Sequence, residues 1–84
     1  MRKRKLLNKL LRSQKNVRFD ELCSLAQAFG FGLARVNGSH HIFRHGLVRD
    51  FLNLQDVRGE AKPYQVRQLL ALVEEYNLDL DDDQ

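Results

Sequence analysis

Several features that mark membrane and secreted proteins are missing from this sequence. No apolar run approaches the roughly 20 residues that a membrane-spanning helix needs. A signal peptide is not expected either, because Asn8 and Lys9 interrupt the leucines that follow the basic N-terminus. The single cysteine, Cys23, allows no internal disulfide and no cysteine-based zinc site of the usual spacing, and it fits a reducing compartment. We therefore expect a cytoplasmic protein that does not associate with membranes.

Each end of the chain also lacks charge of one sign. Residues 1–18 contain eight basic residues and no acid, whereas residues 74–84 contain six acids and no base. A basic arm is typical of proteins that bind phosphate-rich partners, although a merely solvated terminus has the same composition. The acidic end indicates a frayed, solubilising tail, because the helix macrodipole disfavours acids at a helix C-terminus. With 84 residues, the chain is expected to form one domain.

The spacing of apolar residues predicts an α+β domain with the element order α-α-β-β-β-α. Leucines recur at helical spacing near the N-terminus, and a second apolar face recurs around Cys23, which we interpret as a small core residue. The predicted helices span 2–13, 20–29 and 64–77, and the predicted strands span 31–36, 40–44 and 50–54. Helices then cover one face of a three-stranded antiparallel sheet, and the other face stays open for a ligand.

Local signals predict how these elements begin and end. Asp20 is the expected N-cap of the second helix, and Gly30 is expected to end it. Asn37-Gly38 predicts a type I′ hairpin turn. Residues 59–62 are expected to form a loop, after which Pro63 suits the first turn of the last helix.

Three histidines fall close together, at positions 40, 41 and 45, and allow three interpretations. On a strand, His41 and His45 share one face and His40 lies on the other, so the hairpin offers too few ligands for a catalytic zinc, and no metal is expected. A histidine is otherwise often a structural polar residue, which we favour for His40 and His45 taken singly. The third interpretation is acid–base chemistry, because an imidazole exchanges protons near neutral pH.

Basic residues surround the histidine hairpin and favour phosphate binding. Arg35, Arg44 and Arg49 flank the hairpin, and Lys62 precedes the last helix, whose N-terminal N–H groups also suit an anion. Taken singly, each of these side chains is better explained by simple solvation.

The run Gly38-Ser39-His40-His41-Ile42-Phe43-Arg44-His45 resembles the hallmark hairpin of the HicA family of toxins from type II toxin–antitoxin pairs. The preceding Phe29-Gly30-Phe31 and the segment from Lys62 to Leu70 are similar to the family pattern as well. The likeness covers roughly residues 18–77. It divides the chain into a basic N-terminal helix extension at 1–17, a HicA-like core at 18–77 and an acidic tail at 78–84.

This resemblance implies a fold like that of the double-stranded-RNA-binding domain and an mRNA interferase, that is, an endoribonuclease that needs no metal or other cofactor. It implies His41 as the catalytic general acid or base, with Gly38 and Ser39 setting the turn that presents it. It also implies an mRNA substrate and a HicB-type antitoxin that forms a hetero-oligomer with the toxin. The expected RNA-binding residues are Ser39, His40, Arg35, Arg44 and Lys62.

Three points stay open at the level of sequence. The second proton-transfer group is not evident, with His40, Ser39, Tyr64 and Lys62 as candidates. A non-catalytic RNA-binding module of the same fold is the alternative function, since such domains bind RNA through shape and phosphate contacts. A protein-interaction module that docks through the leucine helix or the acidic tail is a third.

Overall fold

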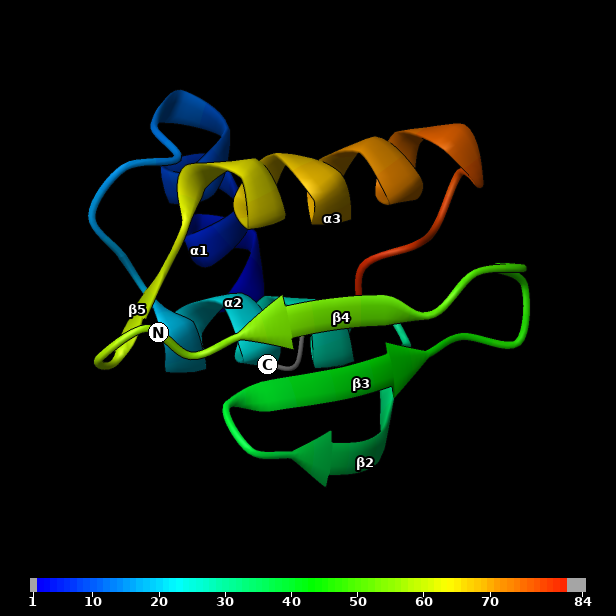
Figure 1. Ribbon diagram of the computed structural model, residues 1–84. Coiled ribbons are helices and arrows are strands. Elements are labelled where there is room, and N and C mark those ends of the chain that lie inside the picture. Colours follow the sequence, from blue (N-terminus) through cyan, green and yellow to red (C-terminus); the bar gives the residue numbers. More distant parts are fainter. Residues whose placement is uncertain (1, 82–84) are drawn as a thin grey trace.

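The computed structural model of this chain describes residues 2–81 (Figure 1). Its elements follow the order of the predicted fold, with two very short strands added. The helices are α1 (Lys3–Arg12), α2 (Phe19–Ala28) and α3 (Pro63–Glu75). The strands are β1 (Val17–Arg18), β2 (Gly32–Asn37), β3 (His40–Arg44), β4 (Leu52–Gln55) and β5 (Glu60–Ala61). The α+β prediction, with its three-stranded antiparallel sheet, is therefore confirmed.

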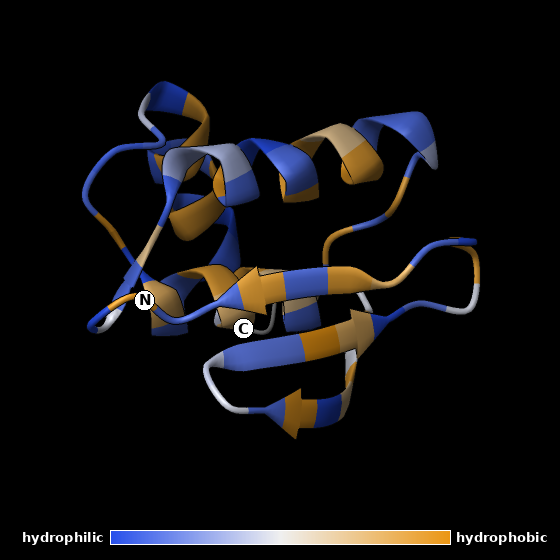
Figure 2. Cartoon of the chain, in the orientation of Figure 1, coloured by the Kyte–Doolittle hydropathy of each residue, from blue (hydrophilic) through white to orange (hydrophobic). Residues whose placement is uncertain are grey.

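Helices cover only one face of the sheet, whose strands run in the order β2-β3-β4 (Figure 1). Phe43 of β3 and Leu52 and Leu54 of β4 are almost completely buried on the helix-bearing face. Asn53, which lies between the two leucines, is exposed on the opposite face. The alternation of orange and blue along β4 in Figure 2 follows this pattern. We call the uncovered side the open face of the sheet.

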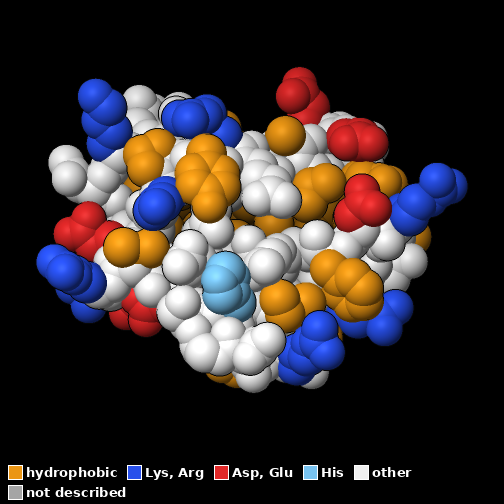
Figure 3. All heavy atoms as spheres, viewed as in Figure 1, with side chains coloured by type: hydrophobic (Ala, Val, Ile, Leu, Met, Phe, Trp, Pro, Cys, Tyr) orange, Lys and Arg blue, Asp and Glu red, His pale blue; other side chains and the backbone are white. Residues whose placement is uncertain are grey.

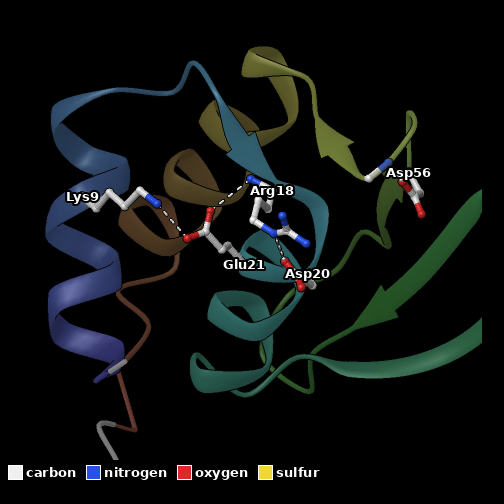
Figure 4. Close-up of polar contacts among 6 residues, drawn as sticks. Lys9, Arg18, Asp20, Glu21 and Asp56 are labelled. Atoms are coloured by element: carbon white, nitrogen blue, oxygen red, sulfur yellow. Dashed lines mark hydrogen bonds and ion pairs between the residues drawn. The ribbon is translucent and has the colours of Figure 1, made fainter.

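Helix α1 is anchored in the core by its leucines. Leu6 and Leu10 are buried, whereas Leu11 is 55% exposed. The basic side chains lie on the remaining surface, and Lys9 reaches across to α2, where its Nζ is 2.7 Å from the Glu21 carboxylate (Figure 4). The N-terminal helix therefore packs as part of the domain.

Helix α2 begins one residue earlier than the sequence signal suggests. The predicted N-cap at Asp20 is wrong, because the helix starts at Phe19 and Arg18 takes the cap position. The carboxylate of Glu21 accepts a hydrogen bond from the backbone N–H of Arg18 at 3.0 Å, which satisfies a donor at the helix start. Asp20 instead contacts the Arg18 guanidinium at the surface, 3.4 Å from Nε (Figure 4). The predicted end of the helix is confirmed by the positive φ of Gly30, 98°.

The hairpin turn differs from the predicted type I′ turn on Asn37-Gly38. Asn37 pairs with His40, so Gly38 and Ser39 are the two central residues. Only Gly38 has a positive φ, 63°, which is the pattern of a type II′ turn with glycine at its first central position. The turn prediction was therefore wrong by one residue in register.

The predicted loop at 59–62 contains a strand. Glu60 and Ala61 form β5, which pairs antiparallel with β1. The backbone N–H of Phe19 also donates to the carbonyl of Gly59 at 2.9 Å. These pairings join the start of α2 to the segment that leads into α3.

Helix α3 begins one residue before the predicted 64 and ends at 75 instead of 77, with Lys62 as N-cap and, as predicted, Pro63 in the first turn. Its Gln65 is the one buried polar side chain among the described residues. The Gln65 amide accepts from Gln55 N–H at 3.0 Å and donates to the Asn53 carbonyl at 3.4 Å. Because β4 is an edge strand, this side chain satisfies backbone groups that would otherwise lack partners.

The first part of the expected tail, 78–81, is not frayed. Leu78 is buried in the core, and the N–H of Asp81 donates to the carbonyl of Ala28 at 2.7 Å. The rest of the tail, 82–84, lies outside the described residues. Within residues 2–81, no helix is both long and apolar enough to cross a membrane.

Candidate functional site

His41 lies on the helix-bearing face of the sheet, at the start of β3. Its cross-strand partners are Val36 in β2 and Leu54 in β4. The imidazole is half-buried and meets the Phe19 ring edge-on, with ring centroids 4.8 Å apart. The His41 ring is therefore supported by a non-polar contact with Phe19, the first residue of α2.

The two nitrogens of the His41 ring have different environments. Nδ1 is buried and has no hydrogen-bond partner. Within residues 2–81 it is the only side-chain nitrogen or oxygen that is both buried and without a partner. Since Nε2 of the same ring makes no hydrogen bond within these residues either, it is not fully buried and reaches solvent. His41 therefore offers one accessible nitrogen to a substrate.

His40, the preceding residue, points to the open face and has an orienting partner. Its Nδ1 lies 3.0 Å from the side-chain oxygen of Asn53 in β4. Because an amide oxygen only accepts, the ring proton sits on Nδ1 and the lone pair of Nε2 is left unused. A histidine with one nitrogen fixed in this way has a defined orientation and tautomer.

Arg35 and Arg44 lie on the open face with His40, and so on the opposite side of the sheet from His41. Together with neighbouring residues they line a groove of about 430 Å³. The lining residues are Ala34, Arg35, Ile42, Arg44, Phe51 and Asn53. The guanidinium carbon of Arg44 sits 5.3 Å from the centre of the Phe51 ring, within range of a cation–π contact. In Figure 3, a histidine, hydrophobic side chains and a Lys or Arg side chain lie next to one another over the sheet.

Ser39 and Lys62 lie away from that groove. Ser39 is in the hairpin turn, where its carbonyl accepts from Asp56 N–H at 2.9 Å and its hydroxyl is 3.5 Å from Nε2 of Gln55. Lys62 is exposed at the N-terminus of α3, next to β5. The residue before β5, Gly59, accepts a hydrogen bond from the N–H of Phe19, so Lys62 follows a segment that is joined to the residue in contact with His41. The structure therefore does not bring the predicted RNA-binding residues together on one face.

His45 is held on both ring nitrogens. The N–H of Leu47 donates to Nδ1 at 3.0 Å, so the ring proton sits on Nε2, which donates to the carbonyl of Phe29 at 2.9 Å. The ring also packs edge-on against Phe31, with centroids 5.1 Å apart. His45 lies just beyond the end of β3, and these contacts make it a structural residue that ties the hairpin to the end of α2.

Cys23 has the environment of a packing residue. It is half-buried against the hydrophobic core, and burial raises the pKa of its thiol to about 11, with the nearby carboxylates of Asp56 and Asp20 adding to the effect. At that pKa very little nucleophilic thiolate forms near neutral pH. The described residues also contain no group of three or more His, Cys, Asp or Glu side chains that could hold a metal ion.

Comparison with known proteins identifies the family. A family model described as the HicA toxin of bacterial toxin–antitoxin systems matches residues 19–74. The chain belongs to the HicA toxin family. No curated protein and no solved structure gives a significant match. As a HicA toxin, it has its role within a toxin–antitoxin system, which implies a cognate antitoxin as its partner.

The matched segment of this HicA chain contains every residue that the sequence singled out for the site. It begins at Phe19, the residue that supports His41, and it excludes α1. Phe19, Asn53 and Phe51 were not among the predicted site residues. Their roles depend on pairing across strands and between layers, which no local pattern reveals.

Proposed function

We propose that this HicA-family toxin is an endoribonuclease that cleaves mRNA with His41 as its general acid or base. The observation that carries the proposal is the accessible Nε2 of His41, displayed at the end of the hairpin within the family match. The His41 ring is supported by Phe19, and the exposed Lys62 follows the segment that is bonded to Phe19 through Gly59. A positioned imidazole can carry out the proton transfers that metal-independent cleavage requires.

The proposed chemistry uses the 2′-hydroxyl of the RNA as nucleophile. Nε2 of neutral His41 accepts the hydroxyl proton while the 2′ oxygen forms its bond to phosphorus, and the bond between phosphorus and the 5′ oxygen breaks. The leaving 5′ oxygen then needs a proton, from the imidazolium or from solvent. Positive charge from Lys62 stabilises the phosphate as its charge develops.

A second candidate, a non-catalytic RNA-binding module, is favoured by one specific observation. For Nε2 to accept a proton, the ring proton must sit on Nδ1, where no acceptor is present among residues 2–81. Catalytic bases are normally oriented by a third group. Under the catalytic proposal, bound RNA must supply that contact or the ring must shift slightly.

The experiment that tests catalysis is cleavage of a labelled mRNA fragment by the purified chain in the presence of a chelator. The parent chain should cleave, and His41→Ala should lose activity by about 10²–10⁴-fold, the usual contribution of one proton-transfer group. Leu47→Ala is the control, because it shortens a side chain that is 70% exposed and lies outside the proposed site. Cleavage by His41→Ala at the parent rate refutes the assignment, and RNA binding without cleavage by the parent favours the second candidate.

The partner is proposed to be a HicB-type antitoxin that covers the His41 side of the molecule. Co-expression with the protein encoded beside this chain should give a hetero-oligomer in which cleavage is suppressed. A neighbouring protein that fails to bind the chain contradicts this part of the proposal.

A further inference from the structure

The open face of the sheet has a composition unusual for an uncovered surface. The exposed Phe51 ring, 57% accessible, lines the groove together with Ile42 and two arginines, and Arg44 on the central strand is the arginine in contact with it. None of the residues that line the groove is acidic. The two arginines have no acidic neighbour in the groove and lie with an exposed aromatic ring. Such a surface suits a partner that carries negative charge and has flat apolar groups.

We propose that this groove binds a single-stranded segment of RNA, with a base stacked on Phe51 and the flanking phosphates held by Arg35 and Arg44. The inference rests on the proposed function in one respect, namely that the RNA is the toxin's substrate. Sheets that carry exposed aromatic side chains bind unpaired bases by stacking, and each stacked base contributes to affinity regardless of its identity.

The geometry of the groove fits this ligand better than it fits a duplex. Arg44 lies over one face of the Phe51 ring, so a base can stack on the outer side of the guanidinium or on the part of the ring that stays exposed. Asn53 lines the groove and also fixes His40, whose Nε2 lone pair faces the same side. That nitrogen can accept a hydrogen bond from a base amino group or a 2′-hydroxyl. Paired bases inside a duplex cannot reach such a surface.

The groove also has a defined relation to His41. His40 and His41 are consecutive on β3 and point to opposite faces, with the turn at Gly38-Ser39 immediately before them. An RNA strand held on the open face reaches the proposed catalytic imidazole by crossing the end of the hairpin. The open face then selects unpaired RNA, and the opposite face acts on it.

The test uses the full chain with His41→Ala, so that binding is measured without cleavage. A short fluorescein-labelled oligouridylate is titrated by fluorescence anisotropy, and a labelled RNA duplex of the same length serves for comparison. Adding Phe51→Ala should weaken binding of the single strand by about 5-fold or more, the lower end of the stacking contribution of one base. Binding of the duplex should not change, and Phe51→Trp should retain the affinity for the single strand.

The arginines are tested through salt dependence. Replacing Arg35 and Arg44 together with glutamine should reduce the slope of log K against log salt by roughly 1.4, or about 0.7 for each lost phosphate contact to a single strand. Leu47→Ala, which shortens a side chain that is 70% exposed, is the control for Phe51. Arg67→Gln, an exposed position on α3, is the control for the arginines.

The outcomes separate this inference from the proposed function. If the parent chain cleaves RNA while Phe51→Ala binds the oligouridylate as tightly as Leu47→Ala does, the inference is overturned and the catalytic proposal stands. If the parent does not cleave but Phe51→Ala and the double arginine variant weaken single-strand binding as stated, the binding site is upheld and the enzyme assignment fails. Equal loss of single-strand and duplex affinity overturns the stacking geometry.

Discussion

The imidazole of His41 meets the ring of Phe19 edge-on at a centroid distance of 4.8 Å, although the two residues belong to different layers of the domain. Phe19 is the first residue of α2 and is buried, whereas His41 is near the start of β3 and only half-buried. The orientation of the histidine therefore depends on where the helix begins. The antiparallel pairing of β1 with β5 fixes the start of the helix, because Gly59, the residue before β5, accepts a hydrogen bond from Phe19 N–H.

This contact predicts a positioning role for Phe19. An edge-to-face aromatic pair contributes about 0.5–1.5 kcal/mol beyond its buried area, so Phe19→Leu should lower the rate of RNA cleavage by roughly 2- to 10-fold if His41 is catalytic. The loss should appear in kcat, with KM little changed, because the accessible cations are untouched. Single-turnover cleavage by Phe19→Leu and Phe19→Tyr checks this, since tyrosine keeps the ring. A Phe19→Leu variant with the parent rate contradicts the positioning role.

The types and order of the main elements could be predicted from sequence because their signals are local. The leucine spacing of α1, the glycine after α2 and Pro63 before α3 each act within a few residues. Boundaries were less predictable. Asp20 looks like a cap, but Glu21, three residues after Arg18, accepts the bond from the helix start and also contacts Lys9, which is distant in sequence.

What could not be predicted depends on pairing between distant segments. Each strand of the β1–β5 pair has only two residues, too few to show an alternating pattern. Alternation along a strand predicts that His40 and His41 point to opposite faces, as they do in the structure. The face on which Arg35 lies depends instead on the pairing of β2 with β3 and on the bulge between Leu33 and Arg35, which no local pattern reveals.

Gly30 is predicted to be sensitive to substitution. Its φ of 98° is unfavourable for any other residue, and an added Cβ would lie 2.8 Å from Nε2 of His45, which is itself hydrogen-bonded to Phe29. Gly30→Ala should therefore lower the free energy of unfolding by about 1–3 kcal/mol, measured by urea denaturation. Gly46→Ala is the matched control, because a Cβ there meets no atom within 4 Å. Equal stability of the two variants refutes the close approach of His45.

Glu21 should make the stability of the domain depend on pH. The hydrogen bond from Lys9 is the largest effect and lowers the pKa of the Glu21 carboxyl below its ordinary value of 4.5. Burial opposes it and is the next largest effect, and the bond from Arg18 N–H lowers the pKa further. A lowered pKa in the folded state means that the contribution is present above about pH 4.5 and is lost as the pH falls through the folded-state value.

Urea denaturation of the parent and of Glu21→Gln across this range measures the effect. Glu21→Gln should be less stable than the parent at neutral pH, and the difference should shrink as the solution is acidified below pH 4.5. Glu75→Gln, at an exposed position near the end of α3, should show no comparable convergence. A stability difference for Glu21→Gln that stays constant with pH argues against the ionised contact.

The adjacent leucines of α1 give the sharpest test of whether the N-terminal helix is an integral part of the domain. Leu10 is fully buried and Leu11 is 55% exposed. The two residues are both leucines on the same helix and differ in their exposure to solvent. Leu10→Ala should lower the free energy of unfolding by about 2–5 kcal/mol, because it leaves a cavity between α1 and the core. Leu11→Ala should change it by about 0.5 kcal/mol or less. If both variants unfold with the parent's midpoint, α1 is a detachable extension of a core that begins near Phe19. A large loss for Leu10→Ala alone, in a single cooperative transition, places α1 inside the folding unit even though the family match excludes it.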